Sequence, residues 1–236
     1  MKIMAFDSTA KSASVSVLDG ERVLAEYTVD NGLTQSELLL PMAEDMLKSL
    51  KLSFSDIELY ACSVGPGSFT GVRIGVSLVK GLAFGRDVPC VGVSTLEALA
   101  ENLKGIKGTV VPVMDARRDQ VYTAIYDSDG QSLSVRLSDA ALSHSGLADI
   151  LRGEEKPIFL VGDGYEITKA ALSRLGVETE ATPDGLRLES AASVGRVAYR
   201  KHLAGESVSD LALAPTYLRM PQAERERLER EKQAKT

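Results

Sequence analysis

The chain opens with an apolar segment that is followed by segments in which apolar and polar residues alternate. Residues 2–6 are almost all apolar, and residues 13–18 alternate with period two, which is typical of a half-buried strand. Asp19-Gly20 is a hairpin turn signal. A third strand is expected over residues 21–29, so the pattern predicts three consecutive strands.

Helical periodicity begins near residue 34. Thr34 and Glu37 have the spacing of a capping box and precede an apolar stripe, which predicts a helix. The pattern up to residue 105 then predicts a strand at 58–64, a helix at about 72–84, a strand at 88–93, and a helix that starts at Ser94 and ends near Lys104-Gly105. The predicted order of the first half is β-β-β-α-β-α-β-α.

The second half repeats this order. It predicts strands at 109–114, 120–126 and 131–136, a helix at 145–152, a strand at 157–161, a helix at 165–175, a weak strand at 177–181 and a helix at 190–203. The first strand of each half ends in an aspartate, Asp7 or Asp115, and the fourth ends in Gly-x-Gly, starting at Gly65 or Gly162. Because element order and turn chemistry agree, we predict two related lobes with a cleft between them.

This layout is the α/β, ribonuclease H-like architecture of actin-like ATPases and sugar kinases. The predicted domains are an N-terminal lobe over residues 1–105, a degenerate C-terminal lobe over 106–204, and a C-terminal segment with a charged tail over 205–236.

In such proteins the hairpin turn after the first strand of each lobe holds phosphate, and it needs small residues so that backbone N–H groups can approach closely. The first lobe offers Asp7, Ser8 and Thr9 as a vestigial nucleotide site. Asp7 could hold a metal-bound water or cap the turn, and we favour the cap.

The matching turn of the second lobe is Asp115-Ala116-Arg117-Arg118. Two arginines fill the space that a phosphate would need, although their guanidinium groups could still meet an anion. We therefore expect no catalytic residues and no cofactor beyond weak binding of ATP or ADP at a subunit junction.

The most specific stretch is Gly-rich and runs from Gly65 to Gly75 at the start of a predicted helix. Such a loop can bind anions, but this one lacks the Lys-Ser/Thr of a Walker A loop. The helix at 72–84 is apolar or small almost all round, which favours burial on all sides. Two interpretations stay open: a partner surface, which we favour, and a core helix covered by its own lobe. The predicted interface residues are Gly65, Pro66, Gly67, Ser68, Phe69, Thr70, Gly71, Val72, Arg73, Gly75, Val76, Val79, Lys80 and Ala83.

Composition excludes several functions. A net charge of −6, 5% aromatic residues and no Trp argue against a protein that grips nucleic acid by itself. Cys62 and Cys90 lie in apolar runs and are expected to be buried thiols. With His144 and His202 as the only histidines, the sequence shows no metal cluster and no protease triad. No signal peptide or membrane-spanning run is evident, so a cytoplasmic location is expected.

The loop from Gly65 to Gly75, together with Gly92-Val93-Ser94-Thr95-Leu96, resembles the TsaB (YeaZ) family. The resemblance extends over roughly residues 1–220. Its further matches are Ala5-Phe6-Asp7-Ser8-Thr9, Leu40-Pro41, Asp115-Ala116-Arg117-Arg118 and Pro215-Thr216-Tyr217-Leu218-Arg219.

The resemblance implies a non-catalytic subunit for bacterial synthesis of N6-threonylcarbamoyladenosine at position 37 of tRNAs that read codons starting with A. It implies a TsaD-type paralogue that carries the metal and the catalysis, a TsaE-type ATPase that joins the assembly, and a homodimer formed through the helix after the Gly-rich loop. The tRNA is then met only through the complex.

Gln35 departs from the family pattern, in which many members have His. The competing hypothesis is a free-standing actin-like small-molecule kinase or ATPase, which would need an intact phosphate turn in the second lobe. The tail from Ala223 to Thr236 is almost wholly charged or polar, and is expected to be a solvated helix, an unstructured end or a partner contact.

Overall fold

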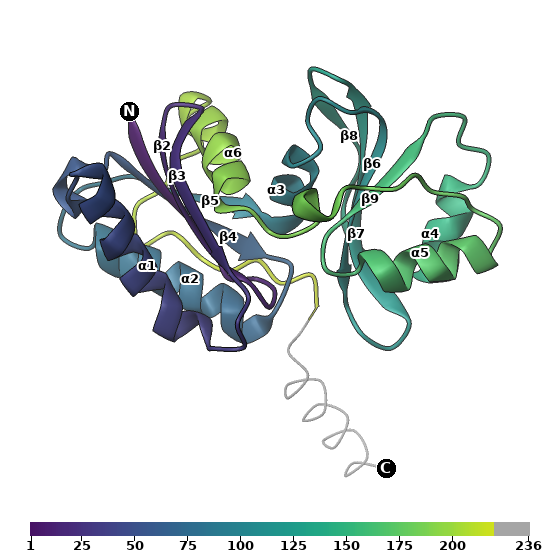
Figure 1. The fold of residues 1–236 in the computed structure, drawn as a ribbon, viewed down its shortest axis with the longest axis horizontal. Coiled ribbons are helices and arrows are strands. Elements are labelled where there is room, and N and C mark those ends of the chain that lie inside the picture. Colours follow the sequence, from purple (N-terminus) through teal and green to yellow (C-terminus); the bar gives the residue numbers. More distant parts are fainter. Residues whose placement is uncertain (220–236) are drawn as a thin grey trace, which may run out of the picture.

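A computed structural model describes residues 1–219 and shows two α/β lobes lying side by side (Figure 1). Lobe 1 is built on a five-stranded sheet with strand order β3-β2-β1-β4-β5, and lobe 2 on a four-stranded sheet with order β8-β7-β6-β9. The elements of the first half are β1 (Lys2–Asp7), β2 (Ala13–Asp19), β3 (Arg22–Val29), α1 (Gln35–Leu50), β4 (Leu59–Gly65), α2 (Phe69–Ala83), β5 (Cys90–Ser94) and α3 (Thr95–Glu101).

The second half follows the same order up to its sixth element. Its elements are β6 (Lys107–Asp115), β7 (Gln120–Asp129), β8 (Leu133–Ser143), α4 (His144–Leu151), β9 (Ile158–Val161), α5 (Tyr165–Arg174) and α6 (Ala191–Leu203). The weak strand expected at 177–181 is only an isolated bridge between Phe159 and Glu180. The two-lobed α/β architecture is thus confirmed, with one strand missing from the repeat.

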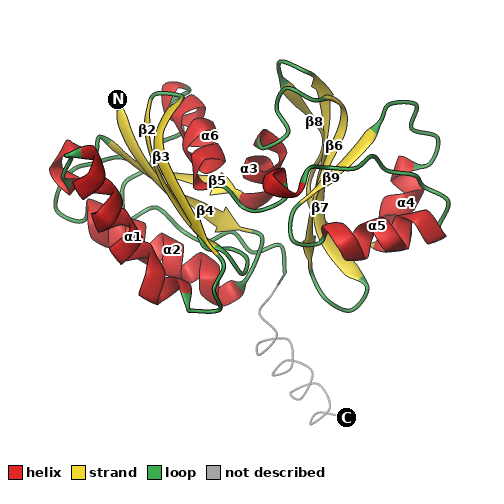
Figure 2. Ribbon diagram, viewed as in Figure 1, coloured by secondary structure: helices red, strands yellow, loops and turns green. Residues whose placement is uncertain are grey.

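The last helix of each half packs on the sheet of the other half (Figures 1 and 2). Leu96 and Leu99 of α3 lie in a cluster with Val110 of lobe 2. In the same way, α6 covers lobe 1, where Gly195 lies so close to β2 that a Cβ atom would come 2.3 Å from Leu18 Cδ1. The predicted boundaries are therefore wrong: residues 191–204 belong with lobe 1, and α3 covers lobe 2.

The opposite faces of the two sheets carry the remaining helices. Helices α1 and α2 pack over Met4 and Phe6 of β1 in the core of lobe 1. Helices α4 and α5 cover Val111 and Val113 of β6 in lobe 2. Successive side chains of each strand point to opposite faces of the sheet, and helices cover both faces. The sequences of the central strands β1 and β6 are therefore almost continuously apolar.

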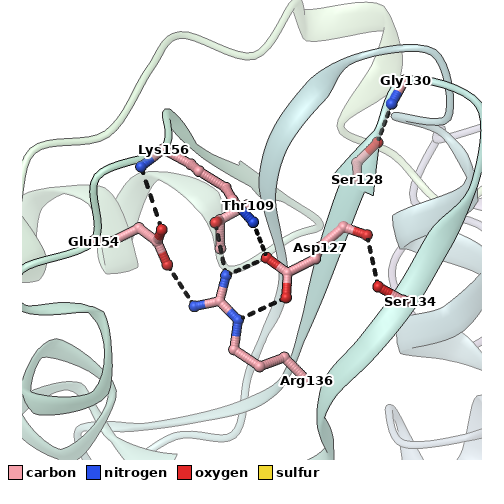
Figure 3. Close-up of polar contacts among 8 residues, drawn as sticks. All are labelled: Thr109, Asp127, Ser128, Gly130, Ser134, Arg136, Glu154 and Lys156. Atoms are coloured by element: carbon pink, nitrogen blue, oxygen red, sulfur yellow. Dashed lines mark hydrogen bonds and ion pairs between the residues drawn. The ribbon is translucent and has the colours of Figure 1, made fainter.

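A polar network ties the strands of lobe 2 to the loop before β9 (Figure 3). The Arg136 guanidinium donates from Nε to Asp127 Oδ2 at 3.0 Å and from Nη2 to Thr109 Oγ1 at 2.9 Å, and it also pairs with Glu154. Lys156 Nζ donates to Asp127 Oδ1 at 2.8 Å. The network joins β6, β7 and β8 to the segment that leads into β9.

The charged tail from Ala223 to Thr236 lies outside the described residues. Within residues 1–219, none of the helices is both long enough and apolar enough to cross a membrane.

Candidate functional site

The β1–β2 turn of lobe 1 is closed by its own side chains. Thr9 donates to Asp7 Oδ1 from its backbone N–H at 2.9 Å and from its hydroxyl at 2.7 Å, and the Ser63 hydroxyl donates to Asp7 Oδ2. Asp7, Ser8 and Thr9 are each 1% exposed. Burial raises the pKa of the Asp7 carboxyl, and the hydrogen bonds from Ser63 and Thr9 oppose that rise.

Asp7 therefore caps the turn, as favoured from the sequence. The polar side-chain atoms of these three residues are engaged within the lobe, and Thr9 also lines the cleft between the lobes. Ser8 Oγ donates to Gly71 O at 2.8 Å, and the Thr9 carbonyl accepts from Ser68 N at 2.7 Å.

The Gly-rich loop lies directly on this turn. A Cβ atom at Gly71 would come 1.9 Å from the Ser8 carbonyl oxygen, and one at Gly75 would come 2.6 Å from Ser8 Oγ. Real Cβ contacts essentially never fall below 3.0 Å. These glycines are thus required by contact with the lobe's own turn. Gly81 has no neighbour within 4 Å of a built Cβ.

The β6–β7 turn of lobe 2 has an unusual backbone. Arg117, Arg118 and Asp119 have φ values of 60°, 55° and 58°, so three successive residues lie in the left-handed region that costs side-chain-bearing residues energy. Arg117 N donates to Asp115 Oδ1 at 2.7 Å, which helps hold this shape. Both arginine side chains are exposed.

A cleft of about 610 Å³ lies between the two turns. Lys11 and Ser68 line it from lobe 1, and Arg117 and Tyr122 from lobe 2. Asp163 lies at the lobe 2 side, where burial raises the pKa of its carboxyl.

Glu189 lies on the segment that leads from lobe 2 back to α6, and it is 3% exposed. Its Oε2 accepts from the Ser12 hydroxyl at 3.1 Å, whereas Oε1 has no hydrogen-bond partner among the described residues. Burial, together with the nearby carboxylates of Asp7 and Asp163, raises its pKa to about 8. No sequence signal marked this carboxyl group.

Helix α2 has two distinct faces. It begins at Phe69, three residues before the predicted start, because Ser68 Oγ caps it by accepting from Gly71 N at 3.2 Å. The inner face packs against the sheet of its own lobe, so more than half of the predicted interface residues are buried within the chain. The buried ones are Gly65, Pro66, Gly71, Val72, Gly75, Val76, Val79 and Ala83. For these residues the core-helix alternative holds and the interface prediction is wrong.

The predicted interface residues that remain accessible lie at the start of α2 and on its outer face. Ser68, Thr70 and Arg73 are exposed, and Gly67, Phe69 and Lys80 are half-buried. Together with the outer face of α1, this helix forms an apolar groove of about 560 Å³. The groove is lined by Gln35, Ser36, Leu39, Leu40, Phe69, Thr70, Arg73, Ile74, Ser77 and Leu78.

The prediction missed Leu40, Ile74 and Leu78, three apolar residues that line this groove. Helical periodicity could have found Ile74 and Leu78, since residues 70, 74 and 78 repeat every four positions on the side of α2 opposite the buried residues. Gln35, the departure from the family pattern, donates from Nε2 to the Ala10 carbonyl at 2.8 Å and so joins the groove to the β1–β2 turn.

Lobe 2 contains a carboxylate, an imidazole and a hydroxyl group in sequence, an arrangement that resembles a hydrolase triad. His144 Nδ1 lies 2.9 Å from Asp119 Oδ1, and His144 Nε2 lies 3.4 Å from Thr168 Oγ1. No sequence motif indicated this arrangement. Thr168 is 0% exposed, however, so its hydroxyl cannot reach a substrate, and the arrangement instead anchors the left-handed turn.

Two further sequence predictions concern thiols and metals. Cys62 and Cys90 are free and buried, as predicted, and burial raises the pKa of the Cys90 thiol to about 11 and that of Cys62 still further. In residues 1–219, no three His, Cys, Asp or Glu side chains are placed so that they could hold a metal ion together.

The chain is similar in sequence and in structure to several known proteins. A family model described as TsaD, tRNA N6-adenosine threonylcarbamoyltransferase, matches residues 34–226. The tRNA threonylcarbamoyladenosine biosynthesis protein TsaB of Bacillus subtilis is 30% identical, over 98% of this chain and all of its own length. TsaB of Escherichia coli is 37% identical over 55% of this chain and 56% of its own. The structure of YeaZ from Pseudomonas aeruginosa aligns with a TM-score of 0.76 at 27% identity, covering 92% of this chain and 99% of that one.

The chain is a two-lobed α/β protein with the actin-like fold, and it shares this fold with YeaZ. The match to the transferase family model extends across both lobes, so the chain is similar in sequence to that family in both of them. The match to B. subtilis TsaB runs from end to end, so the chain belongs to the TsaB family of tRNA threonylcarbamoyladenosine biosynthesis proteins.

Proposed function

We propose that the protein is a non-catalytic subunit that binds a TsaD-type paralogue through the outer faces of α1 and α2. The observation that carries this proposal is the apolar groove of about 560 Å³ along these helices, where Leu40, Ile74 and Leu78 lie at the surface. Contiguous apolar surface rimmed by polar groups such as Arg73 and Ser77 is typical of protein interfaces.

Both phosphate turns support a role without catalysis. In lobe 1 the polar atoms of Asp7 and Ser8 are used within the lobe, and in lobe 2 the arginines of a left-handed turn stand where small residues would be needed. We expect at most weak binding of ATP or ADP and no turnover by the chain alone. Turnover at enzymatic rates would favour the alternative, a free-standing kinase or ATPase of the actin-like class.

The other partners follow from the same role. We infer that the TsaE-type ATPase joins the assembly formed with the paralogue, and that tRNA is met only through the complex. The net charge of −6 supports the second point, because phosphate backbones are bound by clustered cations. In the absence of the paralogue, two copies of the chain would pair through the same groove.

Substitutions on the two faces of α2 test the proposal. Ile74→Arg puts a charge into the groove and should abolish both the homodimer and the complex with the TsaD-type protein while the chain stays folded. Val135→Arg introduces the same charge at a 61% exposed position of lobe 2 and should leave both assemblies intact. Light scattering after size-exclusion chromatography measures the masses, and circular dichroism checks the fold.

Val76→Arg serves as the contrasting change on the same helix. Val76 is 4% exposed, so an arginine there buries an unpaired charge and should unfold lobe 1. If folded Ile74→Arg protein still bound the paralogue as tightly as wild type, the groove would not be the interface. If wild type ignored the paralogue altogether, the subunit role itself would be wrong.

A further inference from the structure

The segment after α6 first runs back along lobe 1. Lys80 Nζ of α2 donates to the carbonyl oxygens of Leu211 and Leu213, both at 3.0 Å. Leu213 is buried in the core of lobe 1, and Thr216 N donates to the Val64 carbonyl at 2.8 Å. We call residues 213–219 the clasp.

The clasp lies tightly against the Gly-rich loop. A Cβ atom at Gly65 would come 2.5 Å from the Thr216 carbonyl oxygen, and Gly65 has a φ of 114°. Only glycine allows this approach without strain. The Gly-rich loop therefore accommodates two segments of its own chain: the β1–β2 turn at Gly71 and the clasp at Gly65.

The clasp next contacts the start of α2. The Tyr217 ring stacks on Phe69 with centroids 4.9 Å apart, and the Tyr217 hydroxyl accepts from Arg73 Nε at 3.1 Å. The Arg73 guanidinium in turn lies 3.8 Å from the centroid of Phe69. Stacking and cation–π contacts of this kind favour one arrangement of all three side chains. Phe69 and Arg73 also line the groove.

The clasp then reaches lobe 2. Arg219 Nη1 donates to the Ala116 carbonyl at 3.3 Å, in the turn that holds the left-handed residues. Its guanidinium also lies 5.6 Å from the ring centroid of Tyr122 on β7. The clasp thus crosses the cleft, with Tyr217 on one side and Arg219 on the other, and both residues line that cleft.

We propose that the clasp couples the two lobes to the partner surface, with Arg219 and Tyr217 as positioning residues for Phe69 and Arg73. Contact of Arg219 with lobe 2 holds Tyr217 in the stack, and the stack fixes the two groove side chains before a partner arrives. Side chains already ordered in the free protein lose less conformational entropy on binding, which strengthens the complex without any contact between Arg219 and the partner. The coupling to partner binding rests on the proposed function; the coupling between the lobes does not.

Hydrogen–deuterium exchange on the full-length protein tests the coupling between the lobes. Arg219→Ala removes the contact with lobe 2 and leaves every contact of α2 in place. We expect faster exchange at both ends of the clasp, in residues 116–122 and, at a distance, in residues 68–73. Leu211→Ala is the matched control, since this side chain is 79% exposed and only its carbonyl group bonds to Lys80. Faster exchange at 116–122 alone, or at neither end, would overturn the proposal.

Affinity for the TsaD-type protein is the second readout. Arg219→Ala and Tyr217→Ala should each raise the Kd by roughly two- to tenfold, the range expected for coupling through residues that do not touch the ligand. Tyr217→Phe keeps the stack on Phe69 and should retain most of the affinity. An unchanged Kd for Arg219→Ala would refute the link to partner binding. If wild type did not bind at all, the proposed function would fail, and the exchange experiment would still decide whether the clasp couples the lobes.

Discussion

Alanine at Gly71 should destabilise the protein, although the same change at Gly81 of the same helix should stabilise it. The difference lies in the space around each Cβ position. At Gly71 the new atom would lie 1.9 Å from the Ser8 carbonyl oxygen, which is backbone and cannot swing away. At Gly81 the new atom would meet nothing within 4 Å.

The magnitudes follow from these two environments. Overpacking a closely fitted site typically costs about 1–3 kcal/mol. Moving α2 away from Ser8 would also break the hydrogen bond from Ser8 Oγ to the Gly71 carbonyl, which is worth about 1 kcal/mol. Gly71→Ala should therefore lower the free energy of unfolding by roughly 2–4 kcal/mol. Gly81→Ala should raise it by about 0.5–1 kcal/mol, because alanine restricts the unfolded chain and favours the helix.

Urea denaturation followed by circular dichroism at 222 nm measures both changes. For a chain of this length, each kcal/mol corresponds to a change of about 2–4 °C in Tm, so the two variants should separate clearly on heating. If Gly71→Ala proved as stable as wild type, the close approach of α2 to the β1–β2 turn could not be what requires glycine at this position.

Three further predictions concern ionisable groups. The pKa of Glu189 is raised to about 8 in the folded state, so between about pH 4.5 and 8 its carboxyl group takes up a proton on folding. Stability should therefore fall as pH rises through this range, by about 1.4 kcal/mol per unit. Glu189→Gln should lack this slope in urea titrations at pH 5–8; equal slopes would contradict it. The pKa of Asp127 is lowered to about 2, mainly by Arg136, so its stabilising effect is present above about pH 4 and is lost as pH falls through about 2. Arg136→Met should shift acid unfolding to higher pH, and an unchanged midpoint would exclude a role for the network. Cys62 and Cys90 should react with Ellman's reagent only after denaturation, and rapid labelling of native protein at pH 8 would show that they are accessible.

Local structure was predictable because its signals are local. The capping box of Thr34 and Glu37, the Asp19-Gly20 turn and the strand over residues 13–18 all lie where the pattern places them. The strand is buried on both faces, however, and not half-buried as its alternation predicted, because its serines are covered as well. Asp7 could be assigned to its turn because an aspartate commonly bonds the backbone two residues ahead, as it does to Thr9 N.

Long-range placement was not predictable in the same way. An apolar stripe on α6 shows that the helix is covered, but not which sheet covers it, so residues 191–204 were assigned to the wrong lobe. The small residues of α2 indicated a close neighbour, yet nothing local identifies that neighbour as Ser8, more than sixty positions earlier. Tyr217 and Arg219 belong to a segment without periodicity, and their partners Phe69 and Ala116 become evident only in three dimensions.

The exchange of last helices between the lobes constrains how this chain can be made. The strands that begin lobe 1 are synthesised first, but α6, which covers one face of their sheet, is among the last parts of the described chain to leave the ribosome. Until then the apolar side chains of Ile3, Ala5 and Leu18 on that face lack their cover. Lobe 1 therefore cannot complete its fold during translation, and its nascent sheet is a surface that aggregation or a chaperone can reach. In a chain that ends before Ala191, this face of the lobe 1 sheet would stay uncovered. The two lobes can therefore not be separated by a single cut, either for expression or in evolution by domain exchange.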